Sequence, residues 1–167
     1  MAKPYQIHKD MNNLKQLFKK QLVTIPNSLI IFVLIIAILG FADSTYLTIE
    51  HFKGIIPPCS IAGGDCGVVL QSSYSKVMGL PVSLLGSLYY LIVSAGIFAY
   101  IDSKNTKILK WILFFTVFGL IASAWFVFVQ AFILHAYCLY CLGSALTSTL
   151  LFLFACYIFK KYSTSPL

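Results

Sequence analysis

Two features in the C-terminal third of the chain restrict what it can fold into: a long uncharged run and a cysteine pair in the middle of that run. Between Lys110 and Lys160 the sequence contains no Lys, Arg, Asp or Glu. A helix that crosses a bilayer needs ~20 apolar residues, so this run is long enough for two crossings. The motif Cys138-Leu139-Tyr140-Cys141 therefore lies close to the place where one membrane helix ends and the next begins.

The composition of the whole chain is typical of a membrane protein. Its 167 residues are 59% hydrophobic and 10% charged, and the mean hydropathy is +0.88. Soluble domains carry about 25% charged residues. The formal net charge of +7 arises from lysines, most of which flank the apolar segments. Charge placed in this way is typical of membrane topology, so we expect the lipid bilayer, and not nucleic acid, to be the partner of these residues.

The apolar segments predict four membrane-spanning helices, at residues 28–51, 82–101, 108–134 and 138–159. We therefore expect an all-α membrane protein, a four-helix bundle in which residues 28–160 form one membrane domain. A long outer loop with a short helix near residues 68–72 would join the first two spans.

The two ends of the chain are predicted to lie outside this domain. Residues 1–27 contain five lysines, with apolar residues recurring at helical spacing. This pattern predicts a basic amphipathic segment on the membrane surface. No small-residue cleavage site follows the apolar region, so we do not expect a cleaved signal peptide. Residues 161–167 are predicted to form a short tail.

The lysines also predict the orientation in the membrane. Ten of them lie in the N-terminal segment, in the turn after the second span and at the C-terminus, whereas Lys53 and Lys76 lie on the other side. Cytoplasmic loops are the ones enriched in lysine. We therefore expect both termini in the cytoplasm, N-in and C-in, with the loop of residues 52–76 on the extracytoplasmic side.

Four of the five cysteines form two close pairs. Cys138 and Cys141 are predicted in the first turn of the fourth helix, where free backbone N–H groups and the helix dipole stabilise a thiolate. Cys59 and Cys66 lie in the outer loop, among Pro and Gly residues that prevent a continuous helix. The predicted orientation places all four on the side where disulfides persist. Cys156 lies near the cytoplasmic end of the fourth helix and fits a small buried apolar side chain.

The pairs allow more than one interpretation. The loop pair alone is compatible with a structural disulfide in a non-catalytic membrane protein. Four cysteines also suggest a zinc site, but a loop pair and a helix pair beside the membrane in an oxidising compartment are untypical ligands, and we predict no metal site. Two dithiols on the same side favour a relay, in which the outer pair meets a soluble protein and the inner pair a lipid-soluble oxidant.

One acidic residue lies within the first predicted span. An ionised carboxylate at the depth of Asp43 is costly unless it faces protein or water. Asp43 is therefore either part of a solvated helix end or a polar wall of an internal cavity, where it would serve as a proton route.

Taken together, these residues resemble the vitamin K epoxide reductase family, in particular its bacterial members without a fused thioredoxin-like domain. The resemblance rests on the order of the two cysteine pairs and on short motifs between them: Cys59, Cys66, Val69, Ser72, Gly79-Leu80-Pro81, Gly86, Cys138 and Cys141. It implies a four-helix bundle around a quinone, either menaquinone or ubiquinone, capped by the loop with its short helix.

The resemblance also implies a role for each paired cysteine. Cys59 would exchange with the partner protein, Cys66 would pass the disulfide to and from Cys138, and Cys141 would lie next to the quinone. Ser72 falls on the loop serine of the family. Further candidates for the quinone pocket are aromatic or polar side chains, which core packing or interfacial anchoring also explains: Tyr89, Trp125, Gln130 and Tyr137.

The sequence departs from the vertebrate enzymes at two quinone-binding positions. Their asparagine and tyrosine correspond here to Val82 and Ala145, which argues against epoxide chemistry. We therefore expect a thiol oxidoreductase of the bacterial cytoplasmic membrane that makes disulfides in an extracytoplasmic thioredoxin-like protein of the DsbA type and passes the electrons to a quinone. A vitamin K epoxide or quinone reductase is the alternative within the same family.

Thiol labelling of intact cells tests the predicted orientation. A membrane-impermeant maleimide added from outside is expected to label Cys59 in the reduced protein, because the loop faces the extracytoplasmic side. Protection of Cys59 until the membrane is permeabilised would contradict the N-in, C-in arrangement.

Overall fold

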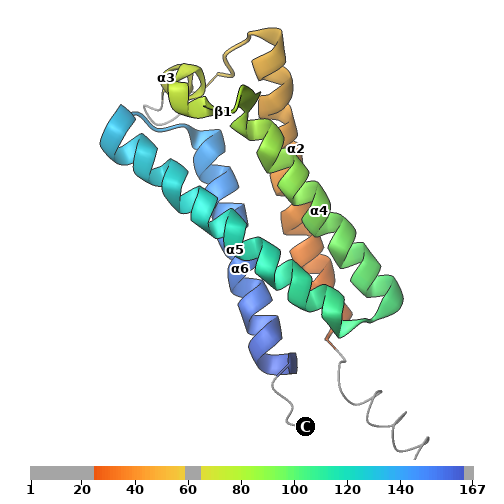
Figure 1. The fold of residues 1–167 in the computed structure, drawn as a ribbon. Helices are drawn as coiled ribbons and strands as arrows, with labels where there is room; N and C mark the ends of the chain where they lie inside the picture. The colour runs from red at the N-terminus through yellow and green to blue at the C-terminus, as the bar shows by residue number, and fades with distance from the viewer. Residues whose placement is uncertain (1–24, 59–64, 164–167) are drawn as a thin grey trace, which may run out of the picture.

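The computed structural model describes residues 25–58 and 65–163, and four long helices dominate these stretches (Figure 1). Each of the four is long and apolar enough to cross a membrane. This confirms the predicted four-helix membrane bundle. In chain order the helices are α2 (Asn27–Lys53), α4 (Val82–Ser103), α5 (Thr106–Phe128), which continues as the π-helix η3 (Val129–Leu134), and α6 (Leu139–Ser163).

The ends of these helices differ by a few residues from the predicted spans. Helix α4 continues through Asp102 and Ser103, and α6 continues past Lys160 and Lys161, because polar residues at a membrane surface extend a helix as readily as apolar ones. Helix α6 begins at Leu139, so Cys138 directly precedes the helix and does not belong to its first turn. The predicted amphipathic segment of residues 1–27 lies almost wholly outside the described residues.

The outer loop folds into a cap over one end of the bundle (Figure 1). Its helix α3 (Cys66–Gln71) starts before the predicted residues 68–72, because the Asp65 side chain accepts a hydrogen bond from the Val68 N–H at 3.2 Å and caps the helix. A short 3₁₀ turn, η2 (Ser73–Ser75), follows. Strands β1 (Lys76–Val77) and β2 (Leu80–Pro81) then form a hairpin that the sequence analysis did not predict. Met78 and Gly79 have φ of 53° and 83°, as a tight hairpin turn requires.

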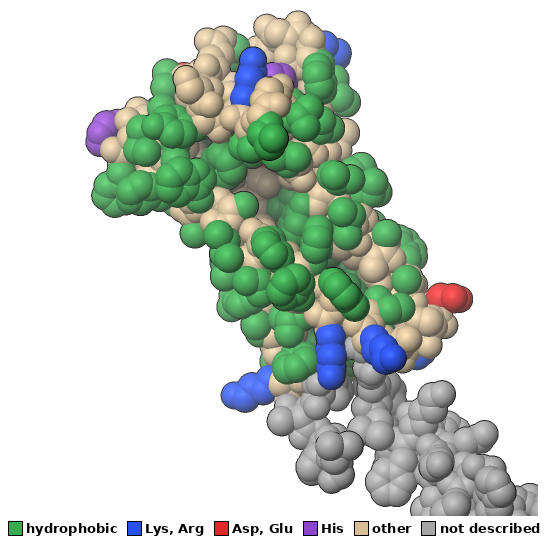
Figure 2. All heavy atoms as spheres, viewed as in Figure 1, with side chains coloured by type: hydrophobic (Ala, Val, Ile, Leu, Met, Phe, Trp, Pro, Cys, Tyr) green, Lys and Arg blue, Asp and Glu red, His purple; other side chains and the backbone are tan. Residues whose placement is uncertain are grey.

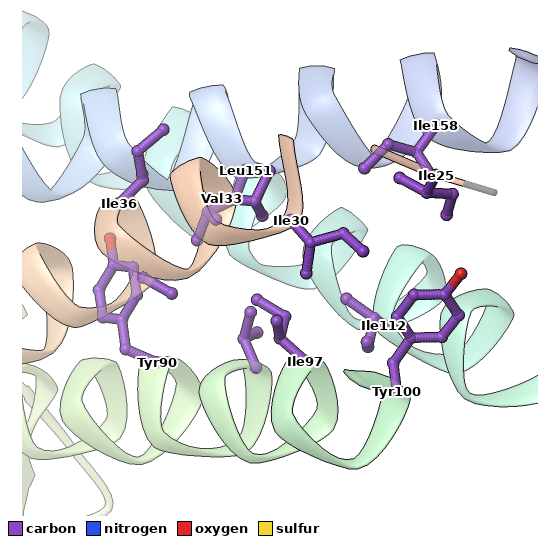
Figure 3. Close-up of a cluster of buried hydrophobic side chains, with 12 residues drawn as sticks. Ile25, Ile30, Val33, Ile36, Tyr90, Ile97, Tyr100, Ile112, Leu151 and Ile158 are labelled. Atoms are coloured by element: carbon purple, nitrogen blue, oxygen red, sulfur yellow. The ribbon is translucent and has the colours of Figure 1, made fainter. Parts of the chain in front are cut away.

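The bundle is filled with side chains in the half away from the cap. Figure 3 shows this cluster, in which isoleucines dominate and all four long helices take part. The cluster consists of Ile25, Ile30, Val33, Ile36, Ala37, Tyr90, Val93, Ile97, Tyr100, Ile112, Leu151 and Ile158. This closed half carries the lysine-rich end of the molecule, whereas the capped half carries the cysteine motif.

Tyr90 marks the limit of the closed half and joins three helices. Its ring packs directly over Gly40 of α2, at a place where any side chain on residue 40 would overlap with it. Its hydroxyl reaches α6, where it donates to the Ser144 carbonyl at 2.7 Å and lies 2.8 Å from the Thr147 hydroxyl. Small residues and hydrogen bonds between helices are what hold helices together in a bilayer. Tyr90 therefore ties α4 to both α2 and α6.

The outer faces of the helices suit a lipid environment. Figure 2 shows apolar side chains along most of the length of the visible face, with lysines gathered beyond them at the closed end. Large apolar side chains such as Phe114, Phe118 and Ile121 are more than half exposed on α5. In water so large an apolar surface would promote aggregation.

Removal of the Tyr90 hydroxyl tests its role as the link between helices. Tyr90→Phe is expected to lower stability in detergent by about 1–3 kcal/mol, because the buried partners on α6 lose their hydrogen bonds. Thermal unfolding followed by circular dichroism measures the effect. Tyr100→Phe is the matched control, since the Tyr100 ring is buried but its hydroxyl has no hydrogen bond within the described residues. Equal unfolding temperatures for the two variants would contradict the assignment.

Candidate functional site

The centre of the capped end is a contact between two cysteines that lie far apart in the sequence. The sulfur atoms of Cys66 and Cys138 are 3.2 Å apart, and both side chains are almost completely buried. Cys66 is itself disulfide-bonded, whereas Cys138 and Cys141 are free thiols. A thiol in contact with a disulfide sulfur is the starting geometry of thiol–disulfide exchange.

The cap is fixed on the bundle by a backbone hydrogen bond next to this contact. The N–H of Asp65 donates to the carbonyl of Tyr137 at 3.0 Å. The next residue on each side of this bond is a cysteine of the contacting pair, Cys66 and Cys138. Val69 of α3 and Leu134 of η3 pack around the two sulfurs. The backbone bond and this apolar packing hold the start of α3 against the start of α6.

Cys138 occupies the N-cap position of α6. Its carbonyl accepts the first hydrogen bond of the helix, from Leu142 N–H at 2.9 Å, and its own N–H donates to the side-chain oxygen of Gln130 at 2.8 Å. Gln130 is buried and lies in the π-helix η3, a type of distortion common at functional sites. The Gln130 side chain, from the preceding helix, thus fixes the backbone at the start of the Cys138–Cys141 motif, which we call the redox turn.

This location favours the thiolate form of Cys138. A hydrogen bond from the Cys141 thiol, assisted by the backbone N–H groups of Cys141 and Tyr140, lowers the pKa of Cys138 despite its burial. The thiolate is the attacking species in disulfide exchange. Of the two thiols in the motif, Cys138 is the one in contact with Cys66.

A cavity of about 870 Å³ lies beneath the cap, within the half of the bundle that the core does not fill. Figure 2 shows the visible face hollowed at this level. All four long helices and the cap segment of residues 70–77 contribute to its walls, which are mostly apolar. Cys141 lies on the α6 wall, so the second thiol of the motif faces the cavity while Cys138 faces the cap.

The cavity has the properties that a quinone headgroup requires. Its volume falls within the usual range for small-molecule sites, and its walls are apolar with a few polar groups. A redox-capable thiol, Cys141, lies on one wall, and the buried hydroxyls of Tyr89 and Ser148 have no hydrogen-bond partner among the residues described. The residues present therefore fit a quinone.

The structure brings some of the predicted pocket residues together and not others. Tyr89 and Trp125 line the cavity, as do Val82 and Ala145, whose apolar side chains offer no hydrogen bond. The three other candidates do not line the cavity. The Gln130 side chain is bonded to the Cys138 N–H, and Tyr137, the residue before Cys138, is exposed. The hydroxyl of Ser72 ends α3 by donating to the Val69 carbonyl at 2.8 Å.

Several cavity residues were missed by the sequence analysis. Ser144 and Ser148 line the α6 wall, and His51 and Lys76 contribute at the capped end. The α6 residues had a signal in the sequence: with Cys141 they follow the i, i+3, i+7 spacing of one helix face. His51 and Lys76 had no such signal in the sequence, because they line the same cavity only once the hairpin is folded against the bundle.

Three further residues singled out by the sequence are Cys59, Cys156 and Asp43. Cys59 lies outside the described residues. Cys156 is a free thiol fifteen residues beyond Cys141 on α6, about 22 Å along the helix. Asp43 does not line the cavity, yet it is no solvated helix end, because one of its carboxylate oxygens is buried without a hydrogen-bond partner in the described part of the chain. Within the described residues, no cluster of three or more His, Cys, Asp or Glu side chains is arranged to hold a metal ion.

Fold and site together define a four-helix membrane protein with a buried cysteine contact above an internal cavity. The chain belongs to the vitamin K epoxide reductase family, which it matches over residues 31–156. Over 118 residues it is 37% identical to the thiol-disulfide oxidoreductase LTO1 of Arabidopsis thaliana. The aligned stretch covers 66% of this chain and 31% of that protein, so the chain spans less than a third of the length of this relative.

Replacement of Gln130 tests whether its side chain holds the redox turn. Gln130→Met keeps the length of the side chain but removes the acceptor, so the buried Cys138 N–H loses its partner at a cost of about 1–3 kcal/mol. We expect a slower exchange between Cys138 and Cys66, measured as the rate at which the Cys66–Cys138 disulfide is trapped in a Cys141→Ala background.

The matched control for this variant is Gln71→Met, which changes an exposed glutamine at the end of α3. It is expected to leave the trapping rate unchanged. Equal rates in the two variants would mean that the hydrogen bond to Gln130 does not position Cys138.

Proposed function

We propose that this protein is a quinone-dependent thiol–disulfide oxidoreductase of the bacterial cytoplasmic membrane. It oxidises an extracytoplasmic thioredoxin-like protein and passes the electrons to menaquinone or ubiquinone. The single observation that carries the proposal is the 3.2 Å contact between the Cys66 and Cys138 sulfurs directly above the cavity that Cys141 lines. Membership of the vitamin K epoxide reductase family and the likeness to a thiol-disulfide oxidoreductase support it.

The proposed relay begins at the loop pair. A thiolate of the reduced partner attacks Cys59 of a Cys59–Cys66 disulfide, and Cys66 leaves as a thiolate. Cys66 then attacks Cys138 of a Cys138–Cys141 disulfide, and Cys141 leaves as a thiolate that faces the cavity. The second thiol of the partner displaces Cys59, which in turn attacks Cys66 and frees Cys138. The partner is now oxidised, and its two electrons are held by Cys138 and Cys141.

The final stage regenerates the inner disulfide. A bound quinone would supply the oxidant, taking up two electrons and two protons and leaving as quinol. Cys141 would be the thiol that meets the acceptor, because it lines the cavity, and Cys138 and Cys141 would together give up two electrons and two protons as the S–S bond between them forms.

Two alternatives make different predictions for the same assay. A reductase that acts on the epoxide would turn over vitamin K epoxide with the partner protein as reductant. Val82 and Ala145 place no hydrogen-bonding side chain on the cavity wall for such a substrate. A non-catalytic membrane protein with a structural loop disulfide would reduce neither compound.

Cysteine variants of the purified protein test the proposal. With reduced thioredoxin-like protein and decylubiquinone, Cys141→Ala is expected to lower quinone reduction on the order of a thousandfold or more, because no thiol then faces the acceptor. The same variant should still form a mixed disulfide with the partner. Quinone loss is followed by absorbance and the mixed disulfide by non-reducing electrophoresis.

Cys156→Ala is the matched control, since it removes a free thiol from the same helix at a distance from the cavity. It is expected to retain full activity. Unchanged quinone reduction by both variants would overturn the proposal, and epoxide turnover in place of partner oxidation would favour the reductase.

A further inference from the structure

The cavity contains two buried hydroxyls whose hydrogen bonds are not used by the protein. Within the described residues, five buried side-chain oxygen atoms lack a hydrogen-bond partner: those of Asp43, Thr45, Tyr89, Ser94 and Ser148. Tyr89 and Ser148 are the two of these that line the cavity. Ser148 is only 3% exposed. A buried hydroxyl without a partner costs about 1–3 kcal/mol, so such a group in a native site calls for a ligand.

The two hydroxyls belong to different helices and meet at one point. Tyr89 comes from α4 and Ser148 from α6, and both oxygens lie over Gly119 of α5, where they occupy the space that a side chain on residue 119 would need. The Tyr89 ring is held in this direction by stacking on Phe115, with ring centroids 5.7 Å apart and planes 12° from parallel. The pair is therefore a preformed arrangement from three helices.

The neighbouring hydroxyls of the cavity are, in contrast, already engaged. The Tyr90 hydroxyl bonds to Ser144 and Thr147, and the Ser44 hydroxyl donates to the Gly40 carbonyl at 2.8 Å. Tyr89 and Tyr90 are adjacent in the chain, yet only Tyr90 holds helices together through its oxygen. The Tyr89 hydroxyl meets only the Ser148 hydroxyl, and neither has another partner within the described residues, so the pair keeps at least one O–H free to donate to a ligand in the cavity.

We infer that the hydroxyls of Tyr89 and Ser148 bind a carbonyl oxygen of the quinone, at the end of the cavity away from Cys141. This inference rests on the proposed function. Ser148 lies seven residues beyond Cys141 on the same face of α6, about 10 Å along the helix. The carbonyl oxygens are the acceptors of a quinone ring, and the Tyr89 and Ser148 hydroxyls are the two buried lining groups without another partner among the described residues. The Tyr89 and Ser148 hydroxyls thus orient the quinone ring between themselves and the Cys141 sulfur.

This site gives the chain a means of recognition that Val82 and Ala145 do not supply. The Tyr89 hydroxyl enters from α4 close to two turns beyond Val82, and the Ser148 hydroxyl from α6 close to one turn beyond Ala145. Hydrogen bonds to a carbonyl also draw electron density from the ring, which makes the quinone a better electron acceptor. The two hydroxyls therefore favour binding of a ring that carries a carbonyl group over binding of a purely hydrocarbon lipid chain.

Equilibrium binding of menaquinone-4 to the full-length protein in detergent tests the inference. Trp125 lines the cavity and Trp111 does not, so in a Trp111→Phe background the quenching of Trp125 fluorescence reports binding. Ser148→Ala and Tyr89→Phe are each expected to raise the Kd about three- to tenfold, as loss of one hydrogen bond predicts. Infrared spectra of carbonyl-labelled menaquinone-4 are expected to show the carbonyl band at higher wavenumber in both variants, because the hydrogen bond that weakens the C=O bond is gone.

Ser94→Ala is the matched control, because it removes an equally unpartnered buried hydroxyl of α4 outside the cavity. It is expected to leave the Kd and the carbonyl band unchanged. If menaquinone-4 binds the unaltered protein and the Ser148 and Tyr89 variants show the same Kd and the same band, the inference is wrong while the proposed function stands. If menaquinone-4 does not quench Trp125 in the unaltered protein, the proposed quinone site itself is wrong.

Discussion

The close packing of the Tyr90 ring over Gly40 is the constraint on which the rest of the molecule depends. Helices in a bilayer gain little from burying apolar surface, because the lipid is equally apolar, so short approaches and hydrogen bonds decide where they meet. At Tyr90 the bundle has both, toward α2 through the glycine and toward α6 through the hydroxyl. On one side of this point the helices are filled with isoleucine, and on the other they surround a cavity.

The redox turn is placed by a second set of constraints, all of them polar. The π-helix at the end of α5 brings the Gln130 amide to the N–H of Cys138, and the backbone bond between Asp65 and Tyr137 brings the cap to the same point. Cys138 therefore faces the cap while Cys141, in the first turn of α6, faces the cavity. The two thiols of one short motif thus lie in two different environments.

The sequence was sufficient for the four-helix architecture because the length of an apolar segment is a strong, local signal. The family resemblance implied an exchange between Cys66 and Cys138, and in the structure their sulfurs are in contact. The sequence was insufficient for the cavity wall, where tertiary packing decides which face of each helix points inward. Gln130 shows this: an amide in an apolar span suggested a ligand contact, yet the π-helical turn directs it to the backbone of Cys138. Ser148 shows another limit, since its spacing from Cys141 places it on the same helix face but does not show that this face lines a cavity.

The filled half of the bundle also separates the cavity from the lysine-rich end of the molecule. Its buried side chains are almost all hydrocarbon, with the tyrosines as the main exception, and Tyr90 closes it toward the cavity. This cluster closes the cavity toward the lysine-rich end, whereas the cavity opens on the hollowed face of the molecule (Figure 2). Under the proposed function, the protons released by the thiols would therefore be exchanged in the capped half and not through the filled half.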